Sequence, residues 1–227
     1  MVRDLLRLGL LPEAVYANDV AAASLEGDPE LSPLVERALS FRVPAATLAR
    51  LAPTQHGQGL LAVFPVPRWD RPRGDIIVYL DRVQDPANVG AIVRVAAGLG
   101  AGSVVCSPGC ANPFSPKAVR ASAGVSLCFP VLKEVPFADL TRWLPASRSV
   151  VAAVPEGGTP LPRFRPRTPL VLVLGNEGQG LAPELVPVTT ERVTVPLARG
   201  VESLNVAVAC GVLLACITGA CHGPYTE

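Results

Sequence analysis

The chain has 227 residues, of which 49% are hydrophobic and 17% are charged, and its formal net charge at pH 7 is +1. This hydrophobic content is ample for a packed core, so we expect a globular protein. The nearly balanced charge excludes a protein that binds nucleic acid through a strongly basic overall surface, whereas local basic patches remain compatible with it.

Residues 1–66 predict a small α/β unit. Its apolar patterns predict helices over residues 3–10, 31–39 and 44–51, and strands over residues 14–17 and 59–64. Because the chain opens directly on a helix, without room for an N-cap signal, we expect this unit to be shortened at its start.

A segment rich in proline and arginine follows, at residues 65–74. We interpret residues 67–74 as a semi-rigid, solvated linker between two domains. The alternative is an RNA contact, since the segment combines basic residues with Trp69.

From residue 75 onward, strand-like and helix-like stretches alternate. The expected strands are residues 76–80, 103–106, 128–132, 149–154, 170–174 and 193–195, and the expected helices are residues 89–99, 116–123, 137–144, 183–186 and a long one from residue 204. Continuous β-branched strands between helices are typical of a parallel sheet that is covered on both faces.

The six cysteines, at positions 106, 110, 128, 210, 216 and 221, include no Cys-x-x-Cys pair, and the chain has only two histidines. We therefore expect no metal site, and reduced, buried thiols as in a cytoplasmic protein. The longest apolar stretch, residues 206–220, falls short of the roughly 18 residues of a membrane span. It is better interpreted as a core or interface helix.

A glycine-rich turn, Gly175 to Gly180, follows the expected strand 170–174. Its three glycines allow a close backbone approach and positive φ, while Asn176 and Glu177 add polar groups. Because open α/β sheets bind ligands at the carboxyl ends of their strands, we interpret this turn as part of a cofactor pocket. Taken alone, the same residues would also suit an ordinary structural turn.

The first strand of the second domain leads into the motif Asn88-x-Gly-x-x-x-Arg94. Pro86 suits a helix start, and Asn88 can cap that helix or bond nearby backbone. Asn88 and Arg94 are six positions apart and so lie on different helix faces. An arginine among apolar neighbours needs a partner or a path to solvent, so a salt bridge or a surface position is the alternative to a functional role.

Three motifs occur in order: Asn88-x-Gly-x-x-x-Arg94, Gly175-Asn-Glu-Gly-x-Gly180, and Pro196-Leu197 followed by Glu202-Ser-Leu-Asn-Val-Ala207. Together they resemble the SpoU (TrmH-like) family of RNA 2′-O-ribose methyltransferases, in the SPOUT superfamily, over roughly residues 75–220. Residues 1–66 resemble, more weakly, the ribosomal-protein-like, RNA substrate-binding domain that often precedes this domain.

The resemblance implies an α/β fold in which the domain at residues 75–227 has a parallel sheet and a C-terminal trefoil knot, an exception to the rule against knotted chains. It implies a homodimer in which the last helix and the first motif meet across the interface. It also implies that S-adenosylmethionine binds in the knot, through Leu174, Gly175, Asn176, Gly178, Gly180, Val195, Leu197, Ser203, Leu204 and Asn205.

The implied reaction is methyl transfer to a ribose 2′-hydroxyl, with ribosomal RNA as the first expected substrate and transfer RNA as the alternative. Arg94 would assist deprotonation, stabilise the developing alkoxide or grip a phosphate. Asn88 would orient Arg94 or the ribose, and Glu177 would anchor the arginine and the loop. Ser203 and Asn205 would bind phosphate or polar groups of the cofactor.

Arg163, Arg165 and Arg167, together with Arg142 and Arg148 against Glu156, make a locally basic segment, which is our candidate for contact with RNA phosphates. A solvated loop is the alternative. Two other functions compete with the enzyme. One is a noncatalytic RNA-binding dimer that retains the fold. The other is a nicotinamide-dependent oxidoreductase, which the sequence disfavours because Gly98-x-Gly-x-Gly102 follows a helix instead of opening one.

Overall fold

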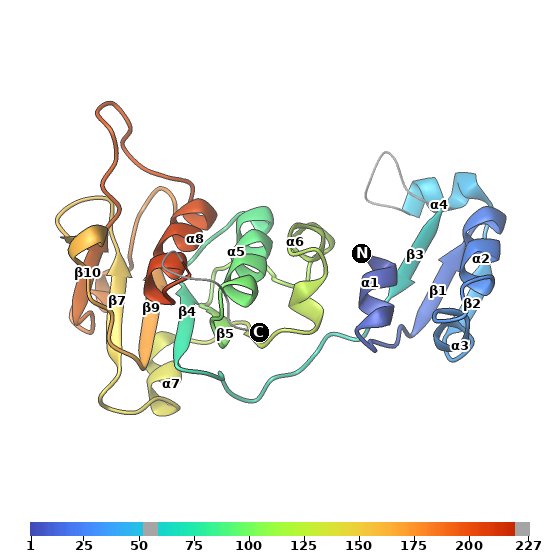
Figure 1. The fold of residues 1–227 in the computed structure, drawn as a ribbon, viewed down its shortest axis with the longest axis horizontal. Coiled ribbons are helices and arrows are strands. Elements are labelled where there is room, and N and C mark those ends of the chain that lie inside the picture. The colour runs from blue at the N-terminus through green and yellow to red at the C-terminus, as the bar shows by residue number, and fades with distance from the viewer. Residues whose placement is uncertain (52–58, 221–227) are drawn as a thin grey trace. The chain divides into compact units, whose positions relative to one another are not determined.

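The computed structural model describes residues 1–51 and 59–220. The chain forms two compact units, Met1–Pro67 and Arg68–Glu227, which are described separately here (Figure 1). Within the described ranges, no helix has both the length and the apolar content needed to cross a membrane.

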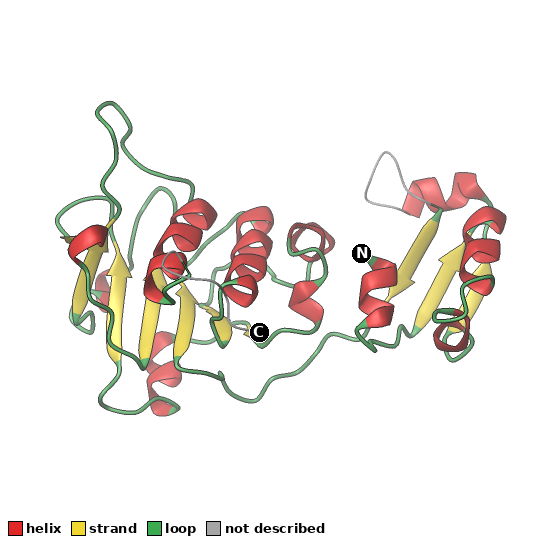
Figure 2. Cartoon of the chain, in the orientation of Figure 1, coloured by secondary structure: helices red, strands yellow, loops and turns green. Residues whose placement is uncertain are grey.

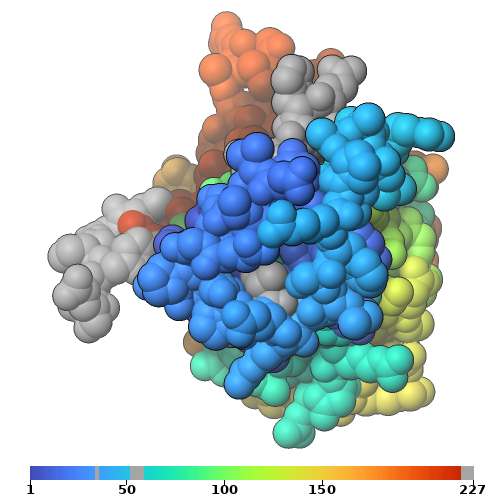
Figure 3. Space-filling view, turned by 90° about the vertical axis from the view of Figure 1, so that its right-hand side faces the viewer, coloured from blue at the N-terminus to red at the C-terminus, as the bar shows by residue number. Residues whose placement is uncertain are grey.

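The first unit contains a small three-stranded sheet. The central strand β1 (Ala14–Ala17) pairs in parallel with β2 (Leu39–Arg42) and antiparallel with β3 (Leu60–Val63). Figure 3 shows the outer surface of this unit in blue. Its core is formed by Leu6, Val15, Leu25 and Leu31. Its helices are α1 (Val2–Arg7), α2 (Asp19–Glu26), α3 (Ser32–Val35) and α4 (Ala45–Leu51).

The sequence prediction is wrong at two places in this unit. The helix expected over residues 31–39 ends at Val35, and Leu39 instead opens β2, where it lies opposite Ala14 of β1. Pairing with a distant strand outweighs the local helical pattern here. Helix α2 was not expected, although Asn18 caps it by accepting a 2.9 Å hydrogen bond from the backbone N–H of Ala21.

The sequence predicts a solvated linker at residues 67–74, but residues 68–74 of the proline- and arginine-rich segment belong to the second unit. Trp69 packs against that unit's core, and the Arg73 guanidinium lies 4.7 Å from the centre of the Trp69 ring. The backbone N–H of Arg73 donates to Ser103 Oγ at 3.2 Å, and that hydroxyl donates to the Arg73 carbonyl at 3.1 Å. These contacts hold the segment on the second unit.

The second unit is built on a seven-stranded sheet in the order β6-β5-β4-β9-β7-β10-β8. Every neighbouring pair is parallel, which confirms the predicted parallel sheet. The sequence predicts a loop where the structure has strand β8, so the prediction is wrong at this strand. The trefoil knot stays a prediction. The strands are β4 (Ile76–Leu80), β5 (Ser103–Cys106), β6 (Val131–Leu132), β7 (Ser149–Ala153), β8 (Thr159–Pro160), β9 (Leu170–Leu174) and β10 (Glu191–Thr194).

Helices cover both faces of this sheet (Figure 2). Side chains alternate along β4, so that Val78 and Leu80 join the core beneath α5 and α8, while Ile77 and Tyr79 join the core beneath α7. Tyr79 meets Phe137 of α7 edge to face, with ring centres 5.0 Å apart. The helices are α5 (Pro86–Gly98), α6 (Pro116–Ala121), α7 (Phe137–Arg142) and α8 (Val206–Ile217).

The glycine of the first motif is explained by helix packing. A Cβ atom on Gly90 would clash with the Ala118 carbonyl oxygen of α6 and would lie 2.8 Å from Ala121 Cβ. Gly90 therefore allows α5 and α6 to approach closely, and it keeps the start of α5 in place.

The described cysteines follow the expectation of buried thiols only in part. Cys106 and Cys210 are buried, as the sequence predicts, whereas Cys110 and Cys216 are half-buried and Cys128 is exposed. Cys128 follows a 3₁₀ turn at residues 125–127, which places its side chain at the surface. Cys221 lies outside the described residues.

Candidate active site

A cavity of about 470 Å³ lies at the carboxyl ends of β7, β9 and β10. Its volume falls within the range usual for small-molecule sites. The ten residues expected to bind the cofactor all line it. The full lining is Ala153, Val154, Pro155, Leu174, Gly175, Asn176, Glu177, Gly178, Gly180, Val193, Val195, Leu197, Ser203, Leu204, Asn205, Val206, Ala209 and Leu213.

The glycine-rich turn forms one wall of this cavity. Asn176 and Gly180 exchange two backbone hydrogen bonds of 3.0 and 2.9 Å, and Asn176 Oδ1 accepts from the backbone N–H groups of Gly178 and Gln179. A Cβ atom on Gly175 would lie only 2.6 Å from the Gly180 carbonyl carbon. Only glycine fits at position 175, and Gly180 adopts a positive φ of 68°.

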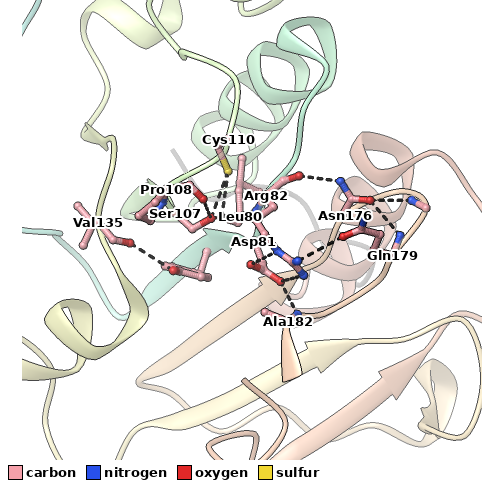
Figure 4. A network of polar contacts seen from close by, with 12 residues as sticks. Leu80, Asp81, Arg82, Ser107, Pro108, Cys110, Val135, Asn176, Gln179 and Ala182 are labelled. Atoms are coloured by element: carbon pink, nitrogen blue, oxygen red, sulfur yellow. Dashed lines mark hydrogen bonds and ion pairs between the residues drawn. The ribbon is translucent and has the colours of Figure 1, made fainter. Parts of the chain in front are cut away.

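A buried polar network connects this turn to the end of β4 (Figure 4). Asp81, which is 3% exposed, accepts hydrogen bonds from the Arg82 guanidinium and, at 2.6 Å, from the backbone N–H of Ala182. The Arg82 carbonyl accepts from Asn176 Nδ2 at 2.8 Å, and Arg82 Nη1 donates to Gln179. These bonds support the left-handed backbone of Arg82, whose φ is 55°.

The three motifs meet in one hydrogen-bonded cluster at the cavity. Asn88 Nδ2 donates to Glu177 Oε1 at 2.8 Å, and Asn205 Nδ2 donates to Asn88 Oδ1 at 3.0 Å. Asn205 Oδ1 also caps α8, since it accepts from the backbone N–H groups of Ala207 and Val208. Each asparagine amide is therefore fixed by its neighbours.

The N-cap of α5 is Asp85, whereas the sequence indicates Asn88 as a candidate cap. Asp85 Oδ1 accepts from the backbone N–H of Ala87 at 2.9 Å. The ammonium of Lys117, 2.7 Å away, together with this backbone bond, lowers the pKa of the Asp85 carboxyl. Asn88 lies one turn further on, and its side chain is thus available to Glu177 and Asn205.

Arg94 lies apart from the cluster. It is exposed on α5, it does not line the cavity, and within the described residues it makes no hydrogen bond or ion pair. The expected anchoring of Arg94 by Glu177 is not seen, because Glu177 accepts from Asn88 instead. Ser203 is exposed and lines the cavity.

One part of the cavity was missed by sequence reasoning. Ala153, Val154 and Pro155 line it from the end of β7. The available signal was their position directly after an expected strand, since the carboxyl ends of neighbouring parallel strands share one edge of the sheet.

A perturbed thiol lies under the first motif. Cys110 Sγ donates to the Leu80 carbonyl at 3.2 Å. Hydrogen bonds from Cys106 and, more weakly, from Ser107 and nearby backbone lower the pKa of Cys110 to about 7, although partial burial opposes this shift. The same hydrogen bond with Cys110 and, next to it, burial raise the pKa of the Cys106 thiol.

The three arginines expected to contact RNA line a second cavity, of about 560 Å³. Arg163, Arg165 and Arg167 meet Arg148 there, next to the amino ends of β7 and β10. The described side chains of the chain bring together no group of three Cys, His, Asp or Glu that could hold a metal.

Comparison with known proteins agrees with this arrangement. The profile of the SpoU rRNA methylase family matches residues 75–215. The chain belongs to this family. The matched range contains all three motifs, and the seven-stranded parallel sheet matches solved structures of the SPOUT type.

Individual relatives extend the similarity beyond the SpoU domain. A tRNA/rRNA methyltransferase of Synechocystis is 36% identical over 180 residues, which span 77% of this chain and 65% of the relative. An AdoMet-bound rRNA methyltransferase of Sinorhizobium meliloti is 28% identical, with a TM-score of 0.79 over 96% of this chain and 84% of that one. A solved RNA 2′-O ribose methyltransferase is 25% identical, with a TM-score of 0.75 over 95% and 84%.

S-adenosylmethionine is the cofactor of the SpoU family. The cavity fits such a molecule because it combines an apolar floor, from Leu174, Val193 and Leu213, with a polar rim that includes Asn176 and Ser203. An adenine and a methionyl chain need apolar surface, whereas a ribose and an amino acid head group need hydrogen bonds.

Proposed function

We propose that the protein transfers the methyl group of S-adenosylmethionine to a ribose 2′-hydroxyl of RNA. The observation that carries this proposal is the cluster of Asn88, Glu177 and Asn205, which joins three separate motifs at the rim of the cavity. The names of the relatives support RNA as substrate, and one of them is a 2′-O ribose methyltransferase. Ribosomal RNA is the first expected substrate, and transfer RNA is the alternative.

The cofactor supplies a methyl group on a sulfonium, and the ribose oxygen must lose its proton and lie in line with the methyl carbon. Asn88 is held from both sides, by Glu177 and by Asn205, so its amide can orient the ribose without reorganising. Gly175 and the Asn176 turn hold the backbone groups that would contact the cofactor.

Arg94 contributes a positive charge without a partner among the described residues. Arginine keeps its proton at working pH, so stabilising the developing alkoxide or an adjacent phosphate is easier for it than acting as a base. We assign Arg94 this electrostatic role, and deprotonation by Arg94 is the alternative.

A homodimer is part of the proposal. The buried face of α8 packs against α5, but Val208 and Val212 on its other face are 53% and 37% exposed. Exposed valines on a helix with no charged residue suit a contact with a second copy. Sedimentation should give twice the mass of the chain, and Val208→Asp with Val212→Asp should reduce it to the monomer.

The first unit is proposed to bind the RNA substrate in the cytoplasm. Phe41 of β2 is 45% exposed and stacks on Tyr16 of β1, with ring centres 5.1 Å apart. An exposed aromatic pair of this kind can stack on an unpaired base.

The decisive experiment is transfer of labelled methyl from S-adenosylmethionine to ribosomal and transfer RNA fractions, tested separately. The expected result is label in one fraction, at positions that resist alkaline hydrolysis, because a methylated 2′-oxygen cannot attack the neighbouring phosphate. The label should disappear with Arg94→Ala. Cofactor binding without any label would instead favour the noncatalytic RNA-binding dimer.

A further inference from the structure

The second cavity of the SpoU domain has an unusual charge balance. Arg148, Arg163, Arg165 and Arg167 line it, against a single carboxylate, that of Glu191. None of the ion pairs among the described residues includes any of these five side chains. Four uncompensated guanidinium groups around a concavity create a strong local attraction for an anion.

The cavity is held in shape by the fold. Leu161 and Phe164 are buried in the core beneath α5 and α8, and they anchor the segment that carries Arg163 and Arg165. Arg165 Nη1 donates to the carbonyls of Pro162 and Phe164 at 3.1 and 3.0 Å. The backbone that carries Arg163 and Arg165 is therefore held in place, and two hydrogen bonds orient the guanidinium of Arg165.

Arg148 adds an unsatisfied donor. Its Nη1 donates to the Pro145 carbonyl at 3.0 Å, but its Nε is buried and has no hydrogen-bond partner among the described residues. A buried N–H without a partner is costly, so Arg148, which lines the cavity, keeps an unused donor.

We infer that this cavity binds a backbone phosphate of the RNA, away from the nucleotide that is methylated. The inference rests on the proposed RNA methyl transfer and adds a second contact site to it. An arginine fork matches phosphate oxygens, and such contacts position a nucleic acid without reading its sequence.

The position of the cavity sets a minimum size for the substrate. It lies at Ser149, where β7 begins, whereas the cofactor cavity lies at Ala153, where β7 ends. The four residue steps between them span about 13 Å at the usual strand rise. An RNA that occupies both sites must bridge this distance, so a free nucleotide would engage only one of them.

The test measures binding of a fluorescent RNA oligonucleotide to the full chain over a range of salt concentrations. It compares the parent with a triple variant, Arg163→Ala, Arg165→Ala and Arg167→Ala. We expect about tenfold weaker binding, and a salt dependence whose logarithmic slope is smaller by about 0.7 for each phosphate that the variant no longer neutralises. Binding of S-adenosylmethionine should not change.

Two further variants sharpen the result. Arg192→Ala removes one positive charge at the position after Glu191. Side chains alternate along a strand, so Arg192 lies on the other face of β10 from Glu191, and RNA affinity should stay within about twofold. Glu191→Gln removes the one carboxylate of the cavity and should tighten RNA binding about threefold at low salt.

An equal loss of RNA binding free energy per charge removed in the triple variant and in Arg192→Ala would overturn the inference, because general surface charge would then explain both. Competition by inorganic phosphate or a nucleoside monophosphate as strong as that by RNA would assign the cavity to a free phosphate ligand. If the triple variant also loses cofactor binding through misfolding, Glu191→Gln decides alone, and unchanged RNA affinity in that variant rejects the proposal. Absence of methyl transfer would reject the proposed reaction and leave these binding results unaffected.

Discussion

The two cavities of the SpoU domain lie at opposite ends of the same strands and differ in how their polar groups are satisfied. At the carboxyl ends, Asn88, Asn176, Glu177 and Asn205 bond one another or nearby backbone. At the amino ends, four arginines face one carboxylate without an ion pair among the described residues. The first arrangement suits orientation of a substrate, and the second suits attraction of one.

This difference predicts different kinetic effects. Groups that act on the reacting atoms affect the transition state, whereas charges distant from those atoms act mainly on binding. Variants around the cofactor cavity should therefore reduce kcat or cofactor affinity, while variants of the arginine cavity should raise KM for RNA. The following predictions test that division, beginning with the largest expected effect.

Arg94→Ala should reduce kcat for methyl transfer at least about a hundredfold, since it removes the charge to which our proposal assigns stabilisation of the reacting oxygen. Affinity for S-adenosylmethionine should be unchanged, because Arg94 does not line the cavity. Single-turnover kinetics and calorimetry measure the two quantities. Arg94→Lys is the matched control, and partial activity of this variant would support the electrostatic role. If Arg94→Ala and Arg94→Lys were both as active as the parent, Arg94 would have no part in the mechanism.

Gly175→Ala should weaken S-adenosylmethionine binding about tenfold or more, because its Cβ would lie 2.6 Å from the Gly180 carbonyl carbon. Gly178→Ala is the control, since the nearest atom to its Cβ, Asn176 Oδ1, is 3.7 Å away. Isothermal calorimetry on both variants, with RNA binding measured in parallel, separates the two cavities. Similar losses at both positions would show that the tight turn is not what holds the cofactor.

The bond between Asn88 and Asn205 should contribute a coupling of about 1 kcal/mol to stability in a double-mutant cycle. Asn205→Ala should also cost about 1 kcal/mol through the lost cap of α8, whereas Asn205→Asp keeps the capping oxygen and removes only the donor to Asn88. Denaturant unfolding measures each variant. Additive effects in the cycle would argue that the two motifs are not joined in solution.

The smallest expected effect is the pH dependence of Cys110 alkylation, which reports on the local structure at the carboxyl end of β4. Its pKa of about 7 lies below the ordinary thiol value, so thiolate forms as pH rises through 7, and alkylation by iodoacetamide should be half-maximal there. Partial desolvation raises the pKa of Cys128, although its side chain is exposed, so Cys128 should react only at higher pH. Cys106→Ala should move the Cys110 midpoint upward, because it removes the main stabilising bond. Mass spectrometry of labelled peptides gives each midpoint.

Much of the SpoU domain follows from local pattern. Strands such as Ile76–Leu80 and Leu170–Leu174 are continuous apolar runs bounded by turn residues, and the structure confirms both. The ten expected cofactor residues line one cavity because they follow strands that end at the same edge of a parallel sheet. The order of the motifs and the ends of the apolar strands can be predicted from the sequence alone.

Other features depend on contacts between distant segments. Leu39 forms part of a strand because β1 pairs with it. The segment that contains Trp69 lies on the second unit because the Trp69 ring packs against the core of that unit. Asn88 is fixed by Glu177 and Asn205, which are 89 and 117 positions away. No local pattern specifies such partners.

The sequence by itself determined the family motifs, the parallel sheet and ten of the residues around the cofactor cavity. Only the tertiary structure decided that Arg148, and not Arg142, lines a cavity with Arg163, Arg165 and Arg167, and that this cavity lies at the end of the sheet away from the cofactor cavity. The physical reason is that strand register and chain crossing set distances in space, whereas residue type and spacing set only the local conformation and the chemistry that each position can offer.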